Sequence, residues 1–173
     1  MTDDLELDDA EMDALLAEWD ELDQLGAEYL AERVPDVGAE LALEDERWLA
    51  QVAASMFPSE APEEGEIEGI AALMALEHVD WLGLALGAWR RGGGSGLDAQ
   101  QVQDDMIALE DVEGDLEDPD GHLQVTEAAL LHVAPRWHEL GVLDDQDQVT
   151  ERGAWGLPRA LFRAWNGSDR AAS

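Results

Sequence analysis

The chain of 173 residues contains no cysteine and no lysine, and it has only one tyrosine and two phenylalanines. Without cysteine, disulfides, thiolate metal sites and cysteine nucleophiles are excluded. No uninterrupted apolar run is long enough to span a bilayer. The first 13 residues are acidic and lack the basic and apolar segments of a secretory signal. We therefore expect a cytoplasmic protein that does not enter a membrane.

Positive charge is also scarce, because nine arginines stand against 42 acidic residues and give a formal net charge of -33. Such a surface repels phosphate backbones and anionic lipid, so direct binding to nucleic acid or membrane is disfavoured. Residues 1–125 hold 35 acids and four arginines, whereas residues 126–173 hold seven acids and five arginines. Adaptation to high salt would also produce this composition, and the charge would then carry no information about function.

Apolar residues recur at helical spacing in the first third of the chain. One pattern predicts a long amphipathic helix that ends near Pro35, and the next predicts a helix that Pro58 stops. We interpret residues 1–57 as an acidic amphipathic helical region and residues 58–68, with their prolines and glutamates, as an exposed linker. The two patterns consist of Met12, Leu15, Leu16, Trp19, Leu22, Leu25, Tyr29 and Leu30, and of Leu41, Leu43, Trp48, Leu49, Val52 and Met56.

The most apolar stretch of the chain runs from Ile70 to Trp89, and its apolar residues fall on nearly every side of a helix. A helix that is hydrophobic all round has to be buried. We therefore predict a mainly α fold whose other helices pack around this central core helix. Its apolar residues are Ile70, Leu73, Met74, Leu76, Val79, Trp81, Leu82, Leu84, Leu86 and Trp89.

The glycine-rich run from Gly92 to Gly96 predicts a connector between two helices. A phosphate loop would need a preceding strand, spaced glycines and usually a lysine, and none of these is present. Asp98 is the expected N-cap of a short helix through Val102, Met106 and Leu109. An acidic loop, Asp111 to Gly121, should follow.

The tetrapeptide Gln-Val-Thr-Glu occurs twice, at residues 124–127 and 148–151. In both copies we expect the threonine to be an N-cap with an acid in the first helical turn, and residues 122–125 to form a short strand. The pattern after the first copy predicts a helix from Thr126 to Leu140 that Gly141 closes. A small β-hairpin over Val142 to Thr150 and a final helix should follow.

Leu140-Gly141-Val142-Leu143 followed by Val149-Thr150-Glu151-Arg152-Gly153 resembles the end of many winged-helix domains. In that family a recognition helix runs into a β-hairpin wing. The resemblance covers about residues 98–165 and implies a helical fold with a small hairpin. We accordingly group residues 69–173 as the core helix plus a winged-helix-like domain.

The resemblance places the helix from residue 126 to 140 where a DNA reader would carry cations and amides. This helix instead carries Glu127 and Glu139 beside its basic residues, and the wing tip has three aspartates, residues 144, 145 and 147. A protein partner is therefore favoured over DNA, and homo-oligomerisation is one form of such contact. The residues expected to bind the partner are Arg136, Arg152, Arg159, Arg163, His132 and His138. In the opposing interpretation, the C-terminal arginines pair with the acidic N-terminal part and the aromatics form core.

No catalytic signature is present, and we expect neither a cofactor nor a metal. Asp118, Asp120, Gly121 and Glu127 match several offsets of a calcium loop, but Leu116 would occupy its first ligand position, so an ordinary Asp-Gly turn is expected. His78 and Glu77 are adjacent and point apart on a helix, which favours a structural histidine. No nucleophile elbow or His-Glu-x-x-His pair occurs.

Four function classes remain after these exclusions. The expected function is a non-enzymatic, acidic protein-interaction or regulatory module that uses its winged-helix-like domain. The alternatives are a DNA mimic that inhibits a basic DNA-binding protein, and a DNA-binding transcriptional regulator from a salt-adapted organism. An enzyme is the class with the least support from the sequence.

Overall fold

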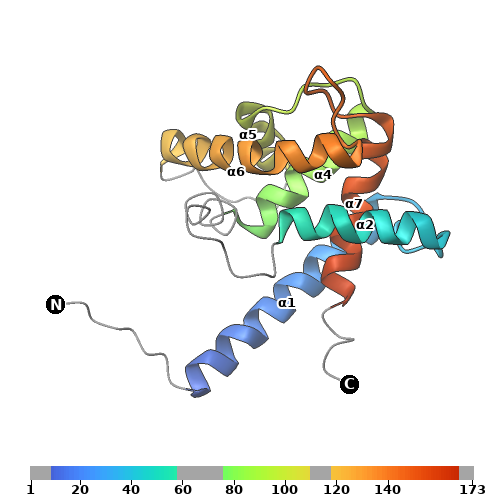
Figure 1. Ribbon diagram of the computed structural model, residues 1–173. Helices are drawn as coiled ribbons and strands as arrows, with labels where there is room; N and C mark the ends of the chain where they lie inside the picture. The colour runs from blue at the N-terminus through green and yellow to red at the C-terminus, as the bar shows by residue number, and fades with distance from the viewer. Residues whose placement is uncertain (1–8, 58–75, 110–117, 168–173) are drawn as a thin grey trace.

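The computed structural model describes residues 9–57, 76–109 and 118–167, with side-chain surroundings given from residue 17 to residue 166. Six α-helices make up nearly all of this part of the chain (Figure 1), which confirms the prediction of a mainly α fold. The predicted linker, residues 58–68, lies outside the described residues. The helices are α1 (Asp9–Arg33), α2 (Leu43–Met56), α4 (His78–Arg91), α5 (Ala99–Ile107), α6 (Pro119–Leu140) and α7 (Glu151–Gly167).

The first two helices follow the predicted patterns. α1 ends two residues before Pro35, and α2 ends two residues before Pro58, because a proline disfavours helical backbone in the residue ahead of it. The first turn of α2 carries Glu44, Asp45 and Glu46, where the helix dipole favours negative charge. Proline positions and acidic first turns are local signals, and the positions of these two helices could therefore be predicted from the sequence alone.

The central helix α4 begins at His78 rather than at Ile70. The backbone N–H of its N-cap, Glu77, donates to Asp80 Oδ2 over 2.9 Å, and this capping interaction fixes the start. Residues 70–75 lie outside the described residues. Residues 80–88 are all buried, as expected for a helix that is apolar on every side. At its other end Gly92 has φ 76°, so this glycine forms the left-handed C-cap.

Two glycines one helical turn apart bring α4 and α5 into close contact. A Cβ on Gly83 would stand 2.7 Å from the backbone nitrogen of Met106, and one on Gly87 would overlap the Asp105 carboxylate. Asp105 therefore lies against the backbone of α4, where it accepts from Arg91 Nη1 over 2.8 Å. The predicted N-cap of α5 is confirmed, since Asp98 Oδ1 accepts from the Gln101 backbone N–H.

The start of α6 departs from the sequence expectation. This helix begins at Pro119, so the predicted strand at residues 122–125 is wrong, and so is the predicted turn at Asp120-Gly121. Asp118 is the N-cap, and proline at the first helical position carries no N–H that would need a partner. Thr126 is accordingly not an N-cap but lies inside the helix, where its hydroxyl donates to the His122 carbonyl over 2.9 Å.

The second copy of the tetrapeptide, residues 148–151, contains the predicted N-cap. Thr150 Oγ1 accepts from the Gly153 backbone N–H over 2.9 Å and so caps α7, and Gly141 closes α6 with φ 71°. Within the described residues the segment 142–150 has two isolated antiparallel bridges, Leu143 with Val149 and Gly96 with Gln148, but no regular strand pair. Between the Leu143 and Val149 positions, the Asp144 carboxylate accepts from the backbone N–H groups of residues 146 and 148 and so stabilises the turn.

α7 contacts α1, α2 and α4, all of which lie at least 60 residues earlier in the chain. Its buried residues Leu157 and Leu161 are part of the same core cluster as Trp81 and Trp137. Two buried tryptophans connect α2 to α6, because Trp48 Nε1 donates to the Leu140 carbonyl and Trp137 Nε1 donates to Ser55 Oγ, each over 2.8 Å. Among the described helices, none has the length and apolarity that crossing a membrane requires.

Candidate functional site

Two of the four arginines expected to bind a partner, Arg159 and Arg163, make hydrogen bonds within the fold. Arg159 is 7% exposed, and its guanidinium donates to the carbonyls of Trp155 at 2.9 Å and Pro35 at 3.1 Å. Burial lowers the pKa of this guanidinium, but an arginine stays charged even so. Arg159 therefore links α7 to the segment that follows α1, and its guanidinium is buried in this contact.

Arg163, on α7, forms hydrogen bonds with the segment that joins α1 to α2 and with the first turn of α2. Its guanidinium donates to both carboxylate oxygens of Glu46, at 2.8 and 2.9 Å, and to the carbonyls of Val37 and Ala39. The Arg163 hydrogen bond holds the pKa of the Glu46 carboxyl below its usual range. The interpretation that the C-terminal arginines pair with the acidic N-terminal part describes Arg163, which pairs with Glu46, and Arg152, which lies near Asp45, whereas Arg159 bonds backbone carbonyls.

We expect Arg163→Ala to lower the free energy of unfolding by about 2 to 3 kcal/mol, because it removes several charge-assisted hydrogen bonds at once. Glu46→Gln should cost less, since Glu46 is partly exposed and the backbone carbonyls keep their donor. A lowered pKa stabilises the fold above the unfolded pKa, and this stability is lost as the pH falls through the folded value. The difference in melting temperature between wild type and Glu46→Gln should thus shrink from about pH 7 to about pH 3. A constant difference would contradict this role.

The other two arginines, Arg136 and Arg152, reach the surface beside α2. The Arg152 guanidinium lies over the Trp48 ring, 4.2 Å from its centroid, with Asp45 at 3.5 Å. Arg136 donates to Gln51 over 3.0 Å and pairs with Glu139 at 2.7 Å. α2 therefore brings together two arginines that are 16 residues apart on different helices.

This surface includes a hollow of roughly 600 Å³ on the outer side of α2. Leu43, Arg47 and Gln51 follow one another at steps of four residues and so share one face of that helix. Leu43 is 65% exposed, and Arg47 makes no hydrogen bond or ion pair with any residue that the structure describes. We call this surface the arginine face. Its members are Leu43, Glu44, Arg47, Trp48, Gln51 and Arg152, which line the hollow, and Arg136, which bonds Gln51.

The histidines divide between surface and structural positions. His132 and His138 are exposed on α6, and His138 Nε2 lies 2.8 Å from Asp147 Oδ1. His122 bridges two helices through Asp80, at 2.7 Å. His78 stacks on Trp165 and contacts Asp23, as expected for a structural histidine. Neither His132 nor His138 belongs to the arginine face.

Sequence reasoning missed Leu43 and Arg47 as site residues. A signal was present, because an exposed leucine, an arginine and a glutamine at steps of four residues form a non-acidic stripe in an acidic region. In the sequence, Leu43 belongs to the apolar pattern that predicts the second helix, and such a pattern normally faces the core. It was missed because helical spacing does not distinguish an apolar residue in the first turn, which can project beyond the core, from one in the middle.

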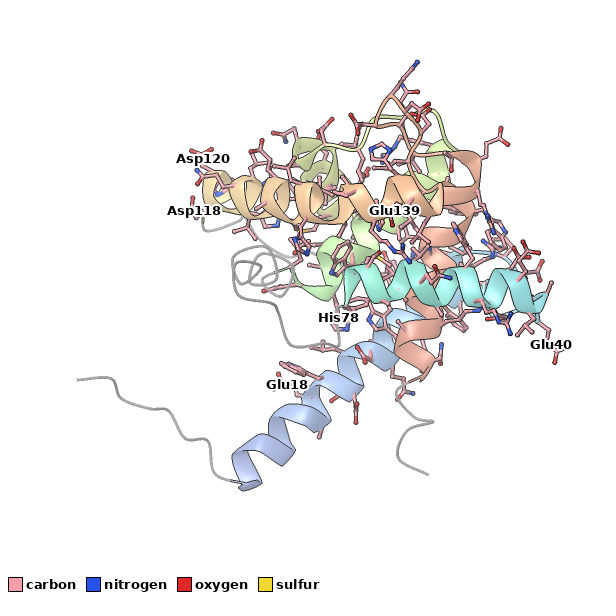
Figure 2. All side chains as sticks on the ribbon, in the orientation of Figure 1. Glu18, Glu40, His78, Asp118, Asp120 and Glu139 are labelled. Atoms are coloured by element: carbon pink, nitrogen blue, oxygen red, sulfur yellow. The ribbon has the colours of Figure 1, made fainter. Side chains whose placement is uncertain are left out.

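Acidic side chains cover much of the remaining surface. Figure 2 shows exposed acids at three separate places: Glu18 on α1, Glu40 before α2, and Asp118 with Asp120 at the start of α6. Within the described ranges no group of three or more His, Asp or Glu side chains is arranged to hold a metal ion. Comparison of the chain with protein-family models, curated proteins and solved structures finds no match.

Proposed function

We propose that the protein is a non-enzymatic interaction module that docks a protein partner on the arginine face. One observation carries this proposal: in a chain with a net charge of -33, two arginines line a surface hollow with an exposed leucine and a tryptophan, and a third arginine, Arg136, bonds Gln51 at the same hollow. Arginine and aromatic residues are enriched in protein interfaces and among the residues that dominate binding energy. We propose a partner segment that supplies a carboxylate for Arg47 and Arg152 and an apolar side chain for Leu43.

The charge balance of the arginine face supports a protein partner. Glu139 pairs with Arg136, and Asp45 lies near Arg152, so these arginines do not form a strongly positive patch that would attract phosphate. The Arg152 guanidinium is held over Trp48, which reduces the conformational entropy that it would lose on binding. Mixed charge around an apolar centre is typical of protein interfaces.

We further propose that residues 98–165 form a winged-helix-like domain that docks protein rather than DNA. The order of the elements supports it: α6 ends at Gly141, the chain turns back through the Leu143–Val149 bridge, and Thr150 caps the next helix. Glu127 and Glu139 are exposed on α6, and the tip of the following loop carries exposed aspartates. These carboxylates would meet DNA phosphates repulsively.

A matched pair of charge reversals tests the arginine face. Arg47 and Arg90 are both exposed, and neither contacts an acid among the residues described, so each reversal changes the net charge equally without removing an internal ion pair. Tagged wild type and Arg90→Glu should capture the same partner from the native lysate at about 0.1 M salt. Arg47→Glu should recover about tenfold less. Equal recovery by both variants would overturn the assignment.

Duplex binding tests the competing function. At about 0.1 M salt we expect no specific DNA binding tighter than micromolar, because the acids of the surface repel phosphate. Specific binding at that affinity, lost on Arg136→Glu with Arg152→Glu, would overturn the proposal in favour of a transcriptional regulator.

A further inference from the structure

The exposed part of α1 presents a second surface that the proposed function does not use. Trp19, Leu22 and Leu25 are 54%, 43% and 55% exposed, and they are half of the six large apolar side chains that the described part of the chain exposes. We call these three residues the α1 strip. In Figure 1 the amino-terminal half of α1 projects away from the other helices. By residue number that half carries Trp19, and Leu22 and Leu25 follow it just before the contact of Gly26 with Trp165.

The α1 strip resembles a helix face that normally packs against a neighbour. Further along the same helix, α7 covers α1 so closely that a Cβ on Gly26 would stand 2.8 Å from the Trp165 ring. Ala27 and Leu30 are buried there. Three large apolar side chains within seven residues, at steps of three, share one side of a helix. Their clustering distinguishes the strip from singly scattered surface residues such as Leu131, which need no partner.

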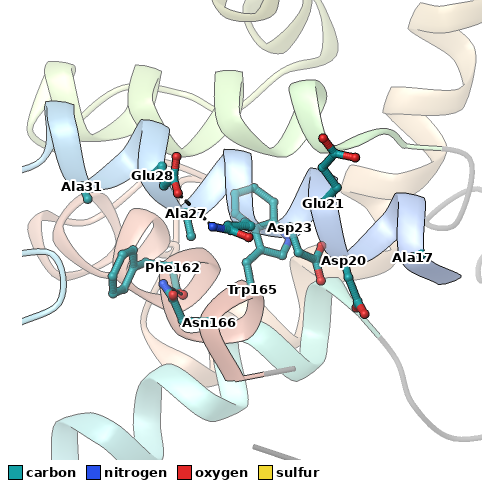
Figure 3. Close-up of a pocket in the computed structure, with 11 residues that line it drawn as sticks. Ala17, Asp20, Glu21, Asp23, Ala27, Glu28, Ala31, Phe162, Trp165 and Asn166 are labelled. Atoms are coloured by element: carbon teal, nitrogen blue, oxygen red, sulfur yellow. Dashed lines mark hydrogen bonds between the residues drawn. The ribbon is translucent and has the colours of Figure 1, made fainter. Parts of the chain in front are cut away.

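Negative charge flanks this apolar strip. Residues 17–33 contain six acids and one arginine, and that arginine, Arg33, is engaged with Glu32 and with the Tyr29 ring. Leu22 and Leu25 each have an exposed acid four residues before them, Glu18 and Glu21, whereas Asp23, four residues after Trp19, already contacts His78. Figure 3 shows further acids of α1, including Asp20 and Glu28, along a hollow of roughly 630 Å³ between α1 and α7.

The charges select among the possible occupants of the strip. A second copy of α1 would bring two sets of acids together, and anionic lipid would be repelled in the same way. A helix with an apolar face and flanking Arg or Lys would bury the three side chains and place its cations four residues apart, opposite the acids. We infer that the α1 strip docks a basic amphipathic helix of a partner protein.

Three synthetic peptides of about 18 residues test this inference on the intact chain, with binding measured by calorimetry at about 0.1 M salt. The first is a Leu/Lys amphipathic helix. The second has the same composition scrambled so that no apolar face forms, and the third replaces Lys with Glu. Only the first should bind at micromolar concentration. Trp19→Ala and Leu25→Ala should each weaken it about tenfold, whereas the control Leu131→Ala on α6 should leave it unchanged.

Equal binding of the scrambled peptide would overturn the inference, because attraction would then require charge alone. Equal weakening by Leu131→Ala would do the same. Sedimentation at the concentrations used should give a monomer, and a dimer that Trp19→Ala dissociates would identify a second copy as the occupant instead. Arg47→Glu should leave peptide binding unchanged. The proposal for the α1 strip and the proposal for the arginine face are therefore tested independently.

Discussion

Trp81→Ala is expected to lower the free energy of unfolding by about 3 to 5 kcal/mol, the largest effect of any single substitution considered for this chain. Trp81 is almost fully buried in the first turn of α4, where its ring and the Phe57 ring pack edge to face with centroids 6.0 Å apart. Truncation removes the apolar contact and leaves a cavity that the neighbouring helices fill only in part. A small domain has about 5 to 15 kcal/mol of stability, so this loss is a large fraction of the margin.

Chemical denaturation followed by circular dichroism measures this effect. Leu131→Ala on α6 is the control, because that side chain is 75% exposed and its loss should change stability by less than about 0.5 kcal/mol. Trp81→Phe should fall between the two, since it keeps an aromatic ring and loses only part of the volume. Equal losses for Trp81→Ala and Leu131→Ala would mean that the core has been placed wrongly.

Gly83→Ala should destabilise the protein by about 1 to 3 kcal/mol, although helix propensity by itself predicts a gain of about 1 kcal/mol. The new methyl group would stand 2.7 Å from the Met106 backbone nitrogen, and backbone on α5 cannot rotate away as a side chain could. The two helices would have to separate along their whole contact. The packing cost therefore exceeds the gain in propensity.

Thermal unfolding of Gly83→Ala and Gly96→Ala provides the test. Gly96 has no atom within 4 Å of the position that a Cβ would take, so its substitution should shift the melting temperature little. A melting temperature above wild type for Gly83→Ala would show that α4 and α5 are not in close contact at this position.

Helix ends were predictable where the sequence carries a local cap. Asp98 and Thr150 each cap the start of a helix through a side-chain oxygen, and Pro58 follows the end of α2. Capping residues and prolines are signals that lie within a few residues of the helix boundary. The start of α6 was missed because Asp118-Pro119 was assigned to an acidic loop, although this pair is itself a cap followed by proline. The β-branched pair Val125-Thr126 then favoured a strand that tertiary packing overrides.

The division of the arginines could not be predicted from the sequence. Arg152, Arg159 and Arg163 look alike along the chain, but Arg159 and Arg163 point to the turn after α1, about 125 residues earlier, and only Arg152 remains at the surface. Their environments depend on which helix packs against which face of α7, and that is information about long-range contacts. The net charge of each segment predicted that acids would meet arginines, but it did not identify which arginines would stay exposed.

The position of α7 in the chain affects how the protein is made. α1 and α2 emerge from the ribosome before α7, the helix that covers them, which begins 118 residues after α1 ends. At a synthesis rate of about 5 to 20 residues per second, the apolar faces of α1 and α2 remain uncovered for on the order of 10 s before α7 is made. During that interval a dense negative charge on the nascent chain discourages neighbouring polypeptides from associating through those faces. The acidity that limits the partners of the finished protein can thus protect the unfinished one.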